Sequence, residues 1–271
     1  MTGKEIRLGR LFSGGENAVV VAVDHGEFDG PLPGMVDLPS VVGSIDPCVD
    51  AILVAPGMLG HCGSAFAQRG APLAIVRANW SSHFCFHWDY EEGIAVPAAS
   101  AEDLVAAGAD MMLICLTLHT GSEARDASNV EVFCGLAAEA RRLGMPVVGE
   151  YFPVRPDRLS PEELHDEVYK GCRIVAELGA DLIKTFYTPK FSEVTRACPI
   201  PILGLGAEKT PKQIQALELA ERIIGSGGRG VVFGRNATQV KDPPAFQRAL
   251  CDVVKKGMSP ADAVAAHGLV D

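Results

Sequence analysis

Residues 179–187 read Gly-Ala-Asp-Leu-Ile-Lys-Thr-Phe-Tyr, a short apolar stretch that carries one lysine, Lys184. The stretch predicts a buried strand with Lys184 at its C-terminal end. Burial favours the neutral form of a lysine, and a neutral amine is the nucleophile that a Schiff-base enzyme uses. The alternative is a lysine whose stem lies along the strand while its ammonium group reaches solvent. The other segments of the chain distinguish these two interpretations.

Seven similar apolar runs accompany this one along the chain. Each run is too short for a helix and too continuous for a strand with one face in water. Strands of this kind are typical of a parallel sheet that is covered on both faces. The eight predicted strands are 18–23, 51–55, 73–76, 111–116, 146–151, 181–185, 200–205 and 230–233.

Helical segments with clear start signals lie between the strands. Ser100, Ser160, Thr210 and Ser259 each stand where an N-cap is expected, three of them followed directly by proline. Eight strands alternating with helices in 271 residues predict a single (β/α)8 TIM barrel, an α/β fold that spans residues 1–271 as one domain. The alternative is an open doubly wound sheet, but no Gly-x-Gly-x-x-Gly motif follows the first strand.

The composition restricts the class of partner. Apolar residues make up 48% of the chain and charged residues 21%, which permits a large core. The net charge of -10 argues against nucleic-acid binding, which requires a basic face. No apolar run has the length of a membrane span, and the eight cysteines include no Cys-x-x-Cys pair. We therefore expect a soluble cytoplasmic protein with reduced cysteines and no metal site.

The ends of the predicted strands carry the residues that suggest chemistry. In a TIM barrel, the active site lies at the C-terminal ends of the strands. An acid, a phenol and the lysine meet there, together with two glycine-containing turns, and this convergence favours the chemical interpretation of Lys184. The residues concerned are Asp24, His25, Arg77, Glu150, Tyr151, Lys184, the turn 204–209 and Gly234-Arg235.

Several motifs resemble those of one known family. They are Val23-Asp-His-Gly with Gly30-Pro-Leu-Pro-Gly34, the lysine strand Gly179-Ala-Asp-Leu-Ile-Lys-Thr, the turn Gly204-Leu-Gly-Ala-Glu-Lys, and Val232-Phe-Gly-Arg-Asn. In this order they resemble the archaeal-type class I fructose-bisphosphate aldolases over almost the whole chain. That family also includes the aminodideoxyheptulosonate synthases and the thiolase that acts on the phosphorylated autoinducer dione.

The resemblance implies roles for three residues. Lys184 would form an iminium with a ketone substrate, without cofactor or metal. Tyr151 would be the proton donor and acceptor, and Asp24 would orient the substrate and assist proton transfer. On the residues alone, Tyr151 can equally be a core tyrosine, and Asp24 an N-cap or a partner of His25.

The late turns resemble the phosphate site that is common in barrels. Backbone N–H groups of glycine-containing turns and an arginine would hold the dianion there. The alternative is that these turns serve only the path of the backbone. The expected substrate-binding and phosphate-binding residues are His25, Gly204, Gly206, Ala207, Gly234 and Arg235.

Two segments depart from the family pattern. The fifth strand reads Val-Val-Gly-Glu-Tyr-Phe-Pro over residues 147–153, where the bisphosphate aldolases carry a tryptophan followed by Tyr-Pro-Arg-Gly. The stretch 79–90 is rich in aromatic residues, and we expect a lid over the barrel mouth in which Trp88 shapes the choice of substrate. A subunit contact is the alternative, and His83 and His87 have helical spacing that would suit a metal only with a third ligand.

The sequence thus predicts a metal-independent class I aldolase that cleaves or forms a C–C bond in a phosphorylated ketose, similar to fructose-bisphosphate aldolase. Two alternatives stay open. One is a Schiff-base transferase of the transaldolase or thiolase type from the same family, and the other is a non-catalytic barrel that binds phosphosugars. The partners expected are a small phosphorylated ketose or aldehyde and, from the resemblance, further copies of the chain in a pentamer or decamer.

Overall fold

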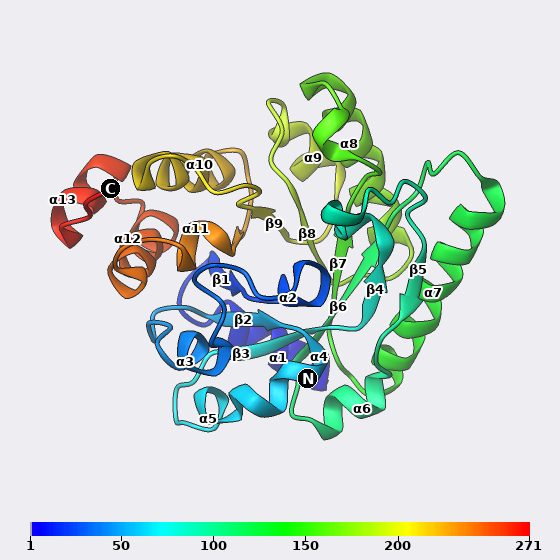
Figure 1. Ribbon diagram of the computed structural model, residues 1–271, viewed down its shortest axis with the longest axis horizontal. Helices are drawn as coiled ribbons and strands as arrows, with labels where there is room; N and C mark the ends of the chain where they lie inside the picture. The colour runs from blue at the N-terminus through cyan, green and yellow to red at the C-terminus, as the bar shows by residue number, and fades with distance from the viewer. Residues whose placement is uncertain (1) are drawn as a thin grey trace.

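A computed structural model describes residues 2–271 and contains a closed barrel of eight parallel strands. Around the barrel the strands follow one another in the order β1-β10-β9-β8-β7-β6-β3-β2, with helices on the outside (Figure 1). The barrel strands are β1 (Ala18–Ala22), β2 (Ala51–Val54), β3 (Leu73–Arg77), β6 (Met111–Leu116), β7 (Val147–Tyr151), β8 (Leu182–Phe186), β9 (Ile202–Leu205) and β10 (Gly230–Phe233). The prediction of a (β/α)8 barrel is confirmed, and the doubly wound alternative is wrong.

The longer helices that surround the barrel begin and end largely where the sequence signals stand. Ser160 and Glu163 form a reciprocal capping box at the start of α8, and Gly268 ends α13 in the left-handed conformation. One expected start is wrong, because α10 begins after Lys212 and the Thr210 hydroxyl bonds to Asn236 instead. These helices are α6 (Ala101–Ala106), α7 (Glu123–Arg142), α8 (Pro161–Glu177), α9 (Phe191–Ala197), α10 (Gln213–Gly225), α12 (Pro243–Lys256) and α13 (Pro260–His267).

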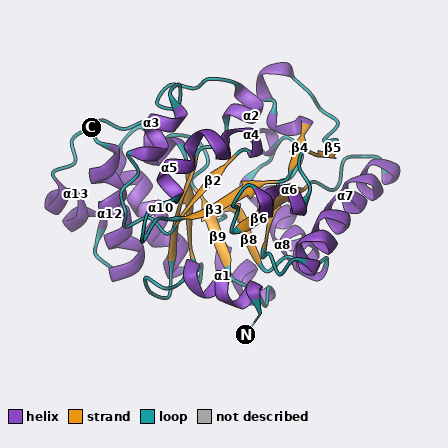
Figure 2. Cartoon of the chain, turned by 90° about the horizontal axis from the view of Figure 1, so that it is seen from below, coloured by secondary structure: helices purple, strands orange, loops and turns teal. Residues whose placement is uncertain are grey.

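Two additional segments close the ends of the barrel (Figure 2). Helix α1 (Gly3–Leu11) lies below the strands, where Leu11 packs into the interior of the barrel. At the opposite end, an antiparallel hairpin of β4 (Asn79–Ser81) and β5 (Ala95–Pro97) follows β3, and α2 (Gly26–Asp29) follows β1. Short turns of helix fill the loops between the first three strands and after β10; they are α3 (Leu38–Gly43), α4 (Pro56–Leu59), α5 (Gly63–Phe66) and α11 (Arg235–Thr238).

The strands divide the core into two layers because successive side chains point to opposite faces. Small and branched residues such as Val20, Leu53 and Leu182 fill the inside of the barrel. Their sequence neighbours, such as Val21 and Ile183, pack outward against the helices. This alternation decides which residues at the strand ends point into the barrel mouth and which point toward a helix.

Candidate active site

Lys184 points into the barrel from the upper part of β8. Leu182, two residues earlier, lies in the interior core, and the neighbouring strand places Glu150 directly beside Lys184 in the register. Only 10% of the Lys184 side chain is exposed, and its Nζ lies 2.6 Å from Glu150 Oε1. The lysine therefore ends inside the mouth against a carboxylate, and the alternative of an ammonium group that reaches solvent is wrong.

Arg77 joins this pair to a second carboxylate. Its side chain is almost completely buried at the end of β3, with Nη1 2.8 Å from Glu150 Oε2. On its other side, the Nε–H group donates a hydrogen bond of 2.8 Å to Asp24 Oδ2. Two cations and two anions thus form one chain across the barrel, from Lys184 through Glu150 and Arg77 to Asp24.

Each carboxylate in this chain is held in its ionised form. Burial raises the pKa of Asp24, but the charges of Arg77 and Lys184 outweigh it and lower that pKa to about 2. The pKa of Glu150 is also lowered, since the attraction of Arg77 and Lys184 exceeds the cost of burial. Burial lowers the pKa of Arg77, but the charge of Glu150 and, to a smaller extent, that of Asp24 outweigh this effect and raise the pKa above its usual value. The buried charges therefore support one another, as a buried ion-pair network requires.

Tyr151 does not reach this network, so its predicted position at the mouth is wrong. It follows Glu150 on β7 and faces the opposite side, into the layer between the barrel and helix α8. Its ring lies so close to Gly171 that a Cβ atom there would be 2.2 Å from the ring, and its hydroxyl donates a 2.7 Å hydrogen bond to Glu167. Burial, followed by that carboxylate, raises the pKa of Tyr151 well above its usual value.

The inward side of β7 carries Val148 and Glu150, and Phe152, directly after the strand, continues the same face. A signal for this register is present in the sequence, because the resembled motif has tyrosine immediately before proline and this chain has Phe152 immediately before Pro153. Alignment on Pro153 rather than on the tyrosine places Glu150 and Phe152 in the mouth and Tyr151 outside. The phenol expected of the family therefore has no counterpart at this position.

Phenylalanine rings lie above the charged network. Phe152 lies 4.4 Å from Phe84 and 4.9 Å from Phe186, measured between ring centroids, and Phe84 lies 4.7 Å from Phe28. The Arg77 guanidinium stacks on two of these rings, 4.8 Å from the centroid of Phe84. We call Phe28, Phe84, Phe152 and Phe186 the phenylalanine wall.

The stretch 79–90 does cover part of the mouth, but through other residues than expected. Phe84 is buried in the wall, whereas Trp88 is 65% exposed. The two histidines are also separated: His83 is buried, with its ring at hydrogen-bond distance from the hydroxyls of Ser81 and Thr117, and 68% of His87 is exposed. Burial lowers the pKa of His83 to about 3, so its imidazole is neutral. Within residues 2–271, no three His, Cys, Asp or Glu side chains gather as metal ligands would.

The glycine-containing turns match the phosphate-site prediction only in part. Gly204 faces α10, where an added Cβ would lie 2.5 Å from Ile223, so strand–helix packing requires glycine at this position; its binding role stays a prediction. The N–H of Gly206 is also engaged, since it donates to the carbonyl of Val232 at 3.1 Å. Ala207, however, adopts a left-handed φ of 49° at the exposed tip of the turn.

Arg235, Gly234 and His25 form the adjoining part of the mouth. Arg235 donates to the Ala207 carbonyl at 3.0 Å, while its buried Nε–H has no partner. Gly234 allows His25 to approach, because a Cβ at position 234 would be 2.3 Å from the imidazole. Burial lowers the pKa of His25 despite the nearby Asp24, and its Nδ1 atom has no hydrogen-bond partner. Unsatisfied donors of this kind suit an anionic ligand.

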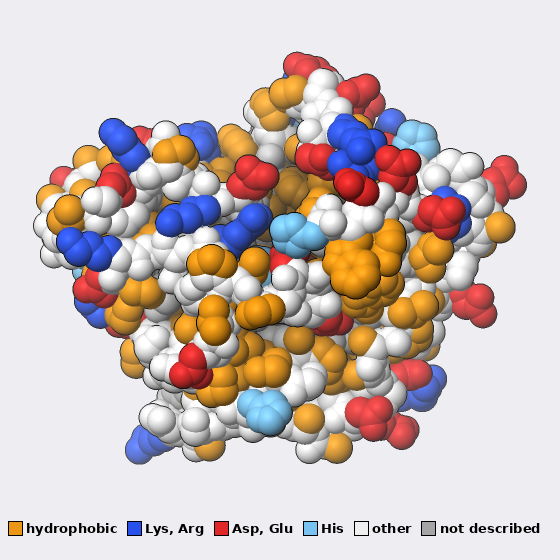
Figure 3. Space-filling model, in the orientation of Figure 1, with side chains coloured by type: hydrophobic (Ala, Val, Ile, Leu, Met, Phe, Trp, Pro, Cys, Tyr) orange, Lys and Arg blue, Asp and Glu red, His pale blue; other side chains and the backbone are white. Residues whose placement is uncertain are grey.

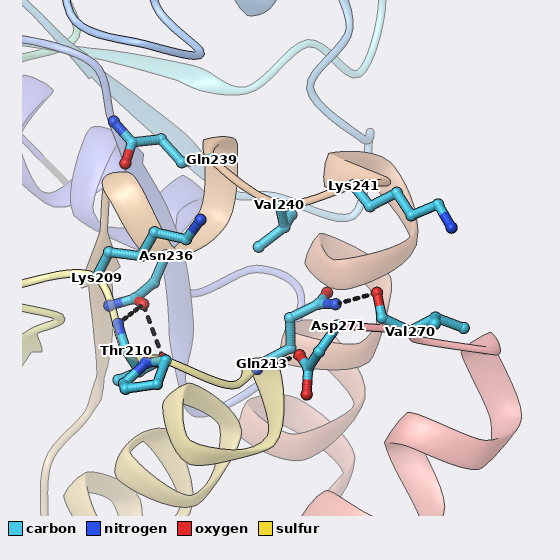
Figure 4. A pocket seen from close by; sticks show the side chains of 10 residues that line it. Lys209, Thr210, Gln213, Asn236, Gln239, Val240, Lys241, Val270 and Asp271 are labelled. Atoms are coloured by element: carbon cyan, nitrogen blue, oxygen red, sulfur yellow. Dashed lines mark hydrogen bonds between the residues drawn. The ribbon is translucent and has the colours of Figure 1, made fainter.

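Asn236 fixes the turn on which this side of the mouth depends. Its Nδ2 donates to the carbonyls of Gly206 and Glu208, and its Oδ1 accepts from the N–H of Thr210. Figure 4 shows the contact between Asn236 and Thr210 at the edge of a pocket that is also lined by Gln213 and Asp271. The pocket lies between α10, α11 and the chain end, outside the group of residues around Lys184.

Glu27 was not identified from the sequence. It lies on α2, one turn after Asp24, and its Oε2 atom is buried without a hydrogen-bond partner. Burial raises the pKa of Glu27 to about 7, even though Arg77 opposes that rise. The chain gave no signal for this carboxyl group, because nothing in a short exposed-looking segment indicates which side chain the fold will bury.

The chain matches the model of the DeoC/LacD family of aldolases over residues 18–240. It belongs to that family. An uncharacterized aldolase of Saccharolobus solfataricus is 30% identical over 97% of this chain and 98% of its own length. A 3-hydroxy-5-phosphonooxypentane-2,4-dione thiolase of Yersinia pestis is 29% identical, covering 96% of this chain and 85% of the thiolase.

Solved structures of aldolases have the same fold. An archaeal fructose 1,6-bisphosphate aldolase superimposes with a TM-score of 0.78 and 25% identity, covering 93% of this chain and 98% of that one. A Schiff-base-forming fructose-1,6-bisphosphate aldolase gives a TM-score of 0.78 and 26% identity, covering 93% and 99%. The resemblance seen in the sequence is therefore confirmed for the DeoC/LacD aldolases. No helix in residues 2–271 is long and apolar enough to cross a membrane.

Proposed function

We propose that this member of the family is a class I aldolase that cleaves or forms a C–C bond beside a ketone through an iminium on Lys184. The observation that carries the proposal is the position of Lys184, inside the barrel mouth with its Nζ 2.6 Å from Glu150. An iminium withdraws electrons from the neighbouring bond, which stabilises the carbanion equivalent that C–C cleavage produces.

Glu150 takes the role of the proton-transferring group in this proposal. Transfer of one proton from Lys184 to Glu150 gives a neutral amine, which attacks the ketone, and a carboxylic acid, which protonates the hydroxyl that leaves as water. The carboxylate then removes the proton from the β-hydroxyl group of the substrate as the C–C bond breaks and an aldehyde departs. The enamine that remains takes a proton on carbon, and water releases the ketone from Lys184.

The side of the mouth near β10 is proposed to hold the phosphate of the substrate. Arg235 supplies a cation with a buried unpartnered Nε–H. The charges of both Arg235 and Asp24 act on the imidazole of His25. Arginine is well suited to a phosphate because its planar N–H groups can contact two oxygens. A phosphorylated ketose is thus the proposed substrate, and the similarity to fructose-bisphosphate aldolases supports it.

A transferase of the thiolase type is the second candidate. The Yersinia relative covers almost the whole chain, and this protein has a carboxylate rather than a phenol beside its lysine. A thiolase would pass the cleaved fragment to a thiol instead of releasing an aldehyde. Release of free aldehyde, with no acceleration by an added thiol acceptor, distinguishes the aldolase from the transferase.

Borohydride trapping tests the proposal. The protein is incubated with phosphorylated and unphosphorylated ketones and reduced, and its peptides are analysed by mass spectrometry. We expect an adduct on Lys184 and none in Lys184→Met, while Lys190→Met, at an exposed lysine after the same strand, keeps the adduct. A protein that binds phosphorylated ketones but gives no adduct with any of them would support the non-catalytic barrel.

The location and the assembly of the protein are also proposals. All eight cysteines are free, which suits a reducing compartment such as the cytoplasm. A homo-oligomer is proposed from the family resemblance, and light scattering of the purified protein measures the number of copies directly.

A further inference from the structure

The phenylalanine wall stands directly above the reacting pair. Phe152 and Phe186 are two residues beyond Glu150 and Lys184 on the same strands, so all four side chains point into the mouth, one layer above the other. A ketone carbon bound to Lys184 therefore has these rings beside the bond that breaks or forms. Phe84 from the segment after β4 and Phe28 from α2 extend the wall around the mouth.

Part of this wall faces solvent, so a substrate can reach it. Phe186 is the partly buried member of the wall, whereas Phe28, Phe84 and Phe152 are buried. Outside the wall, Phe86 lies 6.4 Å from Phe152 between ring centroids and is 43% exposed. Figure 3 shows an apolar patch over the β4–β5 side of this face, with Lys and Arg side chains gathered on the side of α11. The mouth is thus apolar on one side and basic on the other.

The hydroxyl and imidazole groups beside Phe152 are already occupied, whereas Oε2 of Glu27, next to Phe28 on α2, has no hydrogen-bond partner. His83 is at hydrogen-bond distance from Thr117, and the Thr117 hydroxyl donates to the carbonyl of Phe152 at 2.8 Å. Arg77, which lies under the rings, is bound to Asp24 and Glu150. A substrate hydroxyl placed against Phe152 and Phe186 would lose its bonds to water and gain no partner from these occupied groups, which is unfavourable.

We propose that the aldehyde fragment handled by this enzyme is apolar, not a polyhydroxylated sugar fragment. This rests on the proposed aldolase function. The ketone fragment directs its phosphate toward Arg235 and His25, and the aldehyde lies against Phe152 and Phe186. In the forming direction, the enamine carbon attacks the aldehyde carbon, and the aldehyde oxygen takes a proton and becomes a hydroxyl.

The test compares two aldehydes with one donor. Dihydroxyacetone phosphate is offered with phenylacetaldehyde or with glyceraldehyde 3-phosphate, and initial rates of condensation give kcat/KM for each. We expect the phenyl-bearing aldehyde to be preferred at least about tenfold, the range that one well-filled apolar contact supplies. A preference for the sugar aldehyde, while the donor still traps on Lys184, overturns the inference and leaves the aldolase proposal intact.

Variants of the wall locate the preference. Phe186→Asn, at the partly exposed ring, is expected to lower the ratio of the two kcat/KM values about tenfold, with Phe186→Leu retaining most of it. Tyr169→Asn is the matched control, because Tyr169 is a partly exposed aromatic residue on α8, outside the wall. An unchanged ratio in Phe186→Asn, in folded protein that still traps the donor, contradicts the assignment; absence of trapping in the wild type contradicts the aldolase proposal itself.

Discussion

The substitution Tyr151→Phe tests whether the Tyr151 side chain points out of the barrel, as in the structure, or into the mouth, as the family resemblance implies. Tyr151 donates its hydroxyl proton to Glu167 on the outside of the barrel, 2.7 Å away. Glu167 keeps a second partner, because His119 Nδ1 lies 2.8 Å from its other oxygen. The ring itself stays packed against Gly171. The change therefore removes one hydrogen bond to a partly exposed carboxylate and leaves the packing intact.

The expected cost is small. One net hydrogen bond is worth about 1–1.5 kcal/mol, so the melting temperature should fall by about 2–5 °C in a chain of this size. Since no atom of the phenol reaches Lys184, we expect kcat to stay within about twofold of the wild-type value. A differential scanning calorimetry run and the steady-state rate of cleavage, with the ketone that traps best on Lys184, provide the two numbers.

Glu150→Gln, one residue earlier, should behave in the opposite way. It preserves the size of the side chain but leaves Arg77 and Lys184 with one buried anion between them. Loss of the proton-transferring group should lower kcat by about 10²–10⁴-fold, and breaking the buried ion pairs should cost about 3–5 kcal/mol. Glu167→Gln is the matched control, with the same chemical change at the outer carboxylate and an expected kcat near wild type.

One outcome refutes this reasoning. If Tyr151→Phe lost more than about 50-fold in kcat while its melting temperature fell by only a few degrees, the phenol would have to act in the site, and the outward position of Tyr151 could not be the catalytic one. If Glu150→Gln remained folded and fully active, the proton-transferring role of Glu150 would be refuted instead.

Three further expectations concern pH and packing. The pKa of His83 is lowered to about 3, so the unfolded chain binds more protons between pH 6.5 and 3 and stability falls across that window, by about 5 kcal/mol in total; in His83→Gln, acid denaturation should begin at lower pH. The pKa of Glu27 is raised to about 7, so the folded chain binds more protons and stability falls as pH rises from 4.5 to 7. Glu27→Gln should therefore be more stable than wild type at pH 8, by at most about 3 kcal/mol, and show no such gain at pH 4, as measured by urea denaturation. Gly204→Ala places a Cβ 2.5 Å from Ile223 and should cost about 1–3 kcal/mol without raising KM for a phosphorylated ketone; a large rise in KM would support the binding role of Gly204.

The architecture followed from the sequence because period and length are strong signals. Eight apolar runs, each flanked by helix starts such as Ser160-Pro, have few solutions other than a barrel. The strand that carries Lys184 was also predicted correctly, because its apolar run is a clear strand signal and Lys184 is its one ionisable residue. The β4–β5 hairpin was not foreseen, since strands of three residues leave no periodic pattern.

The side chains at the strand ends were harder to place. A strand alternates between two faces, so an error of one residue exchanges the inside for the outside. That error put Tyr151 in the mouth as the proton-transferring residue and gave Glu150 no role, although both stand at the same strand end. The glycines are ambiguous for another reason: a glycine that lets a ligand approach and a glycine that lets a helix approach look identical in sequence, and Gly204 packs closely against a helix.

The charge balance of the barrel mouth explains why Glu150 and Arg77 belong together. A lysine deep in a barrel needs an anion, and a lone carboxylate beside it would favour the unreactive ammonium form. Arg77 contacts Glu150 and Asp24 at 2.8 Å each. Its positive charge therefore offsets part of the negative charge that would otherwise stabilise the ammonium form of Lys184. Proton transfer from Lys184 to Glu150 then leaves one cation and one anion, Arg77 and Asp24, in contact with each other. Arg77 also lowers the pKa of Glu150, so the ion pair is the resting state, and the transfer leaves the Arg77–Asp24 pair with its 2.8 Å hydrogen bond and no single unpaired buried charge.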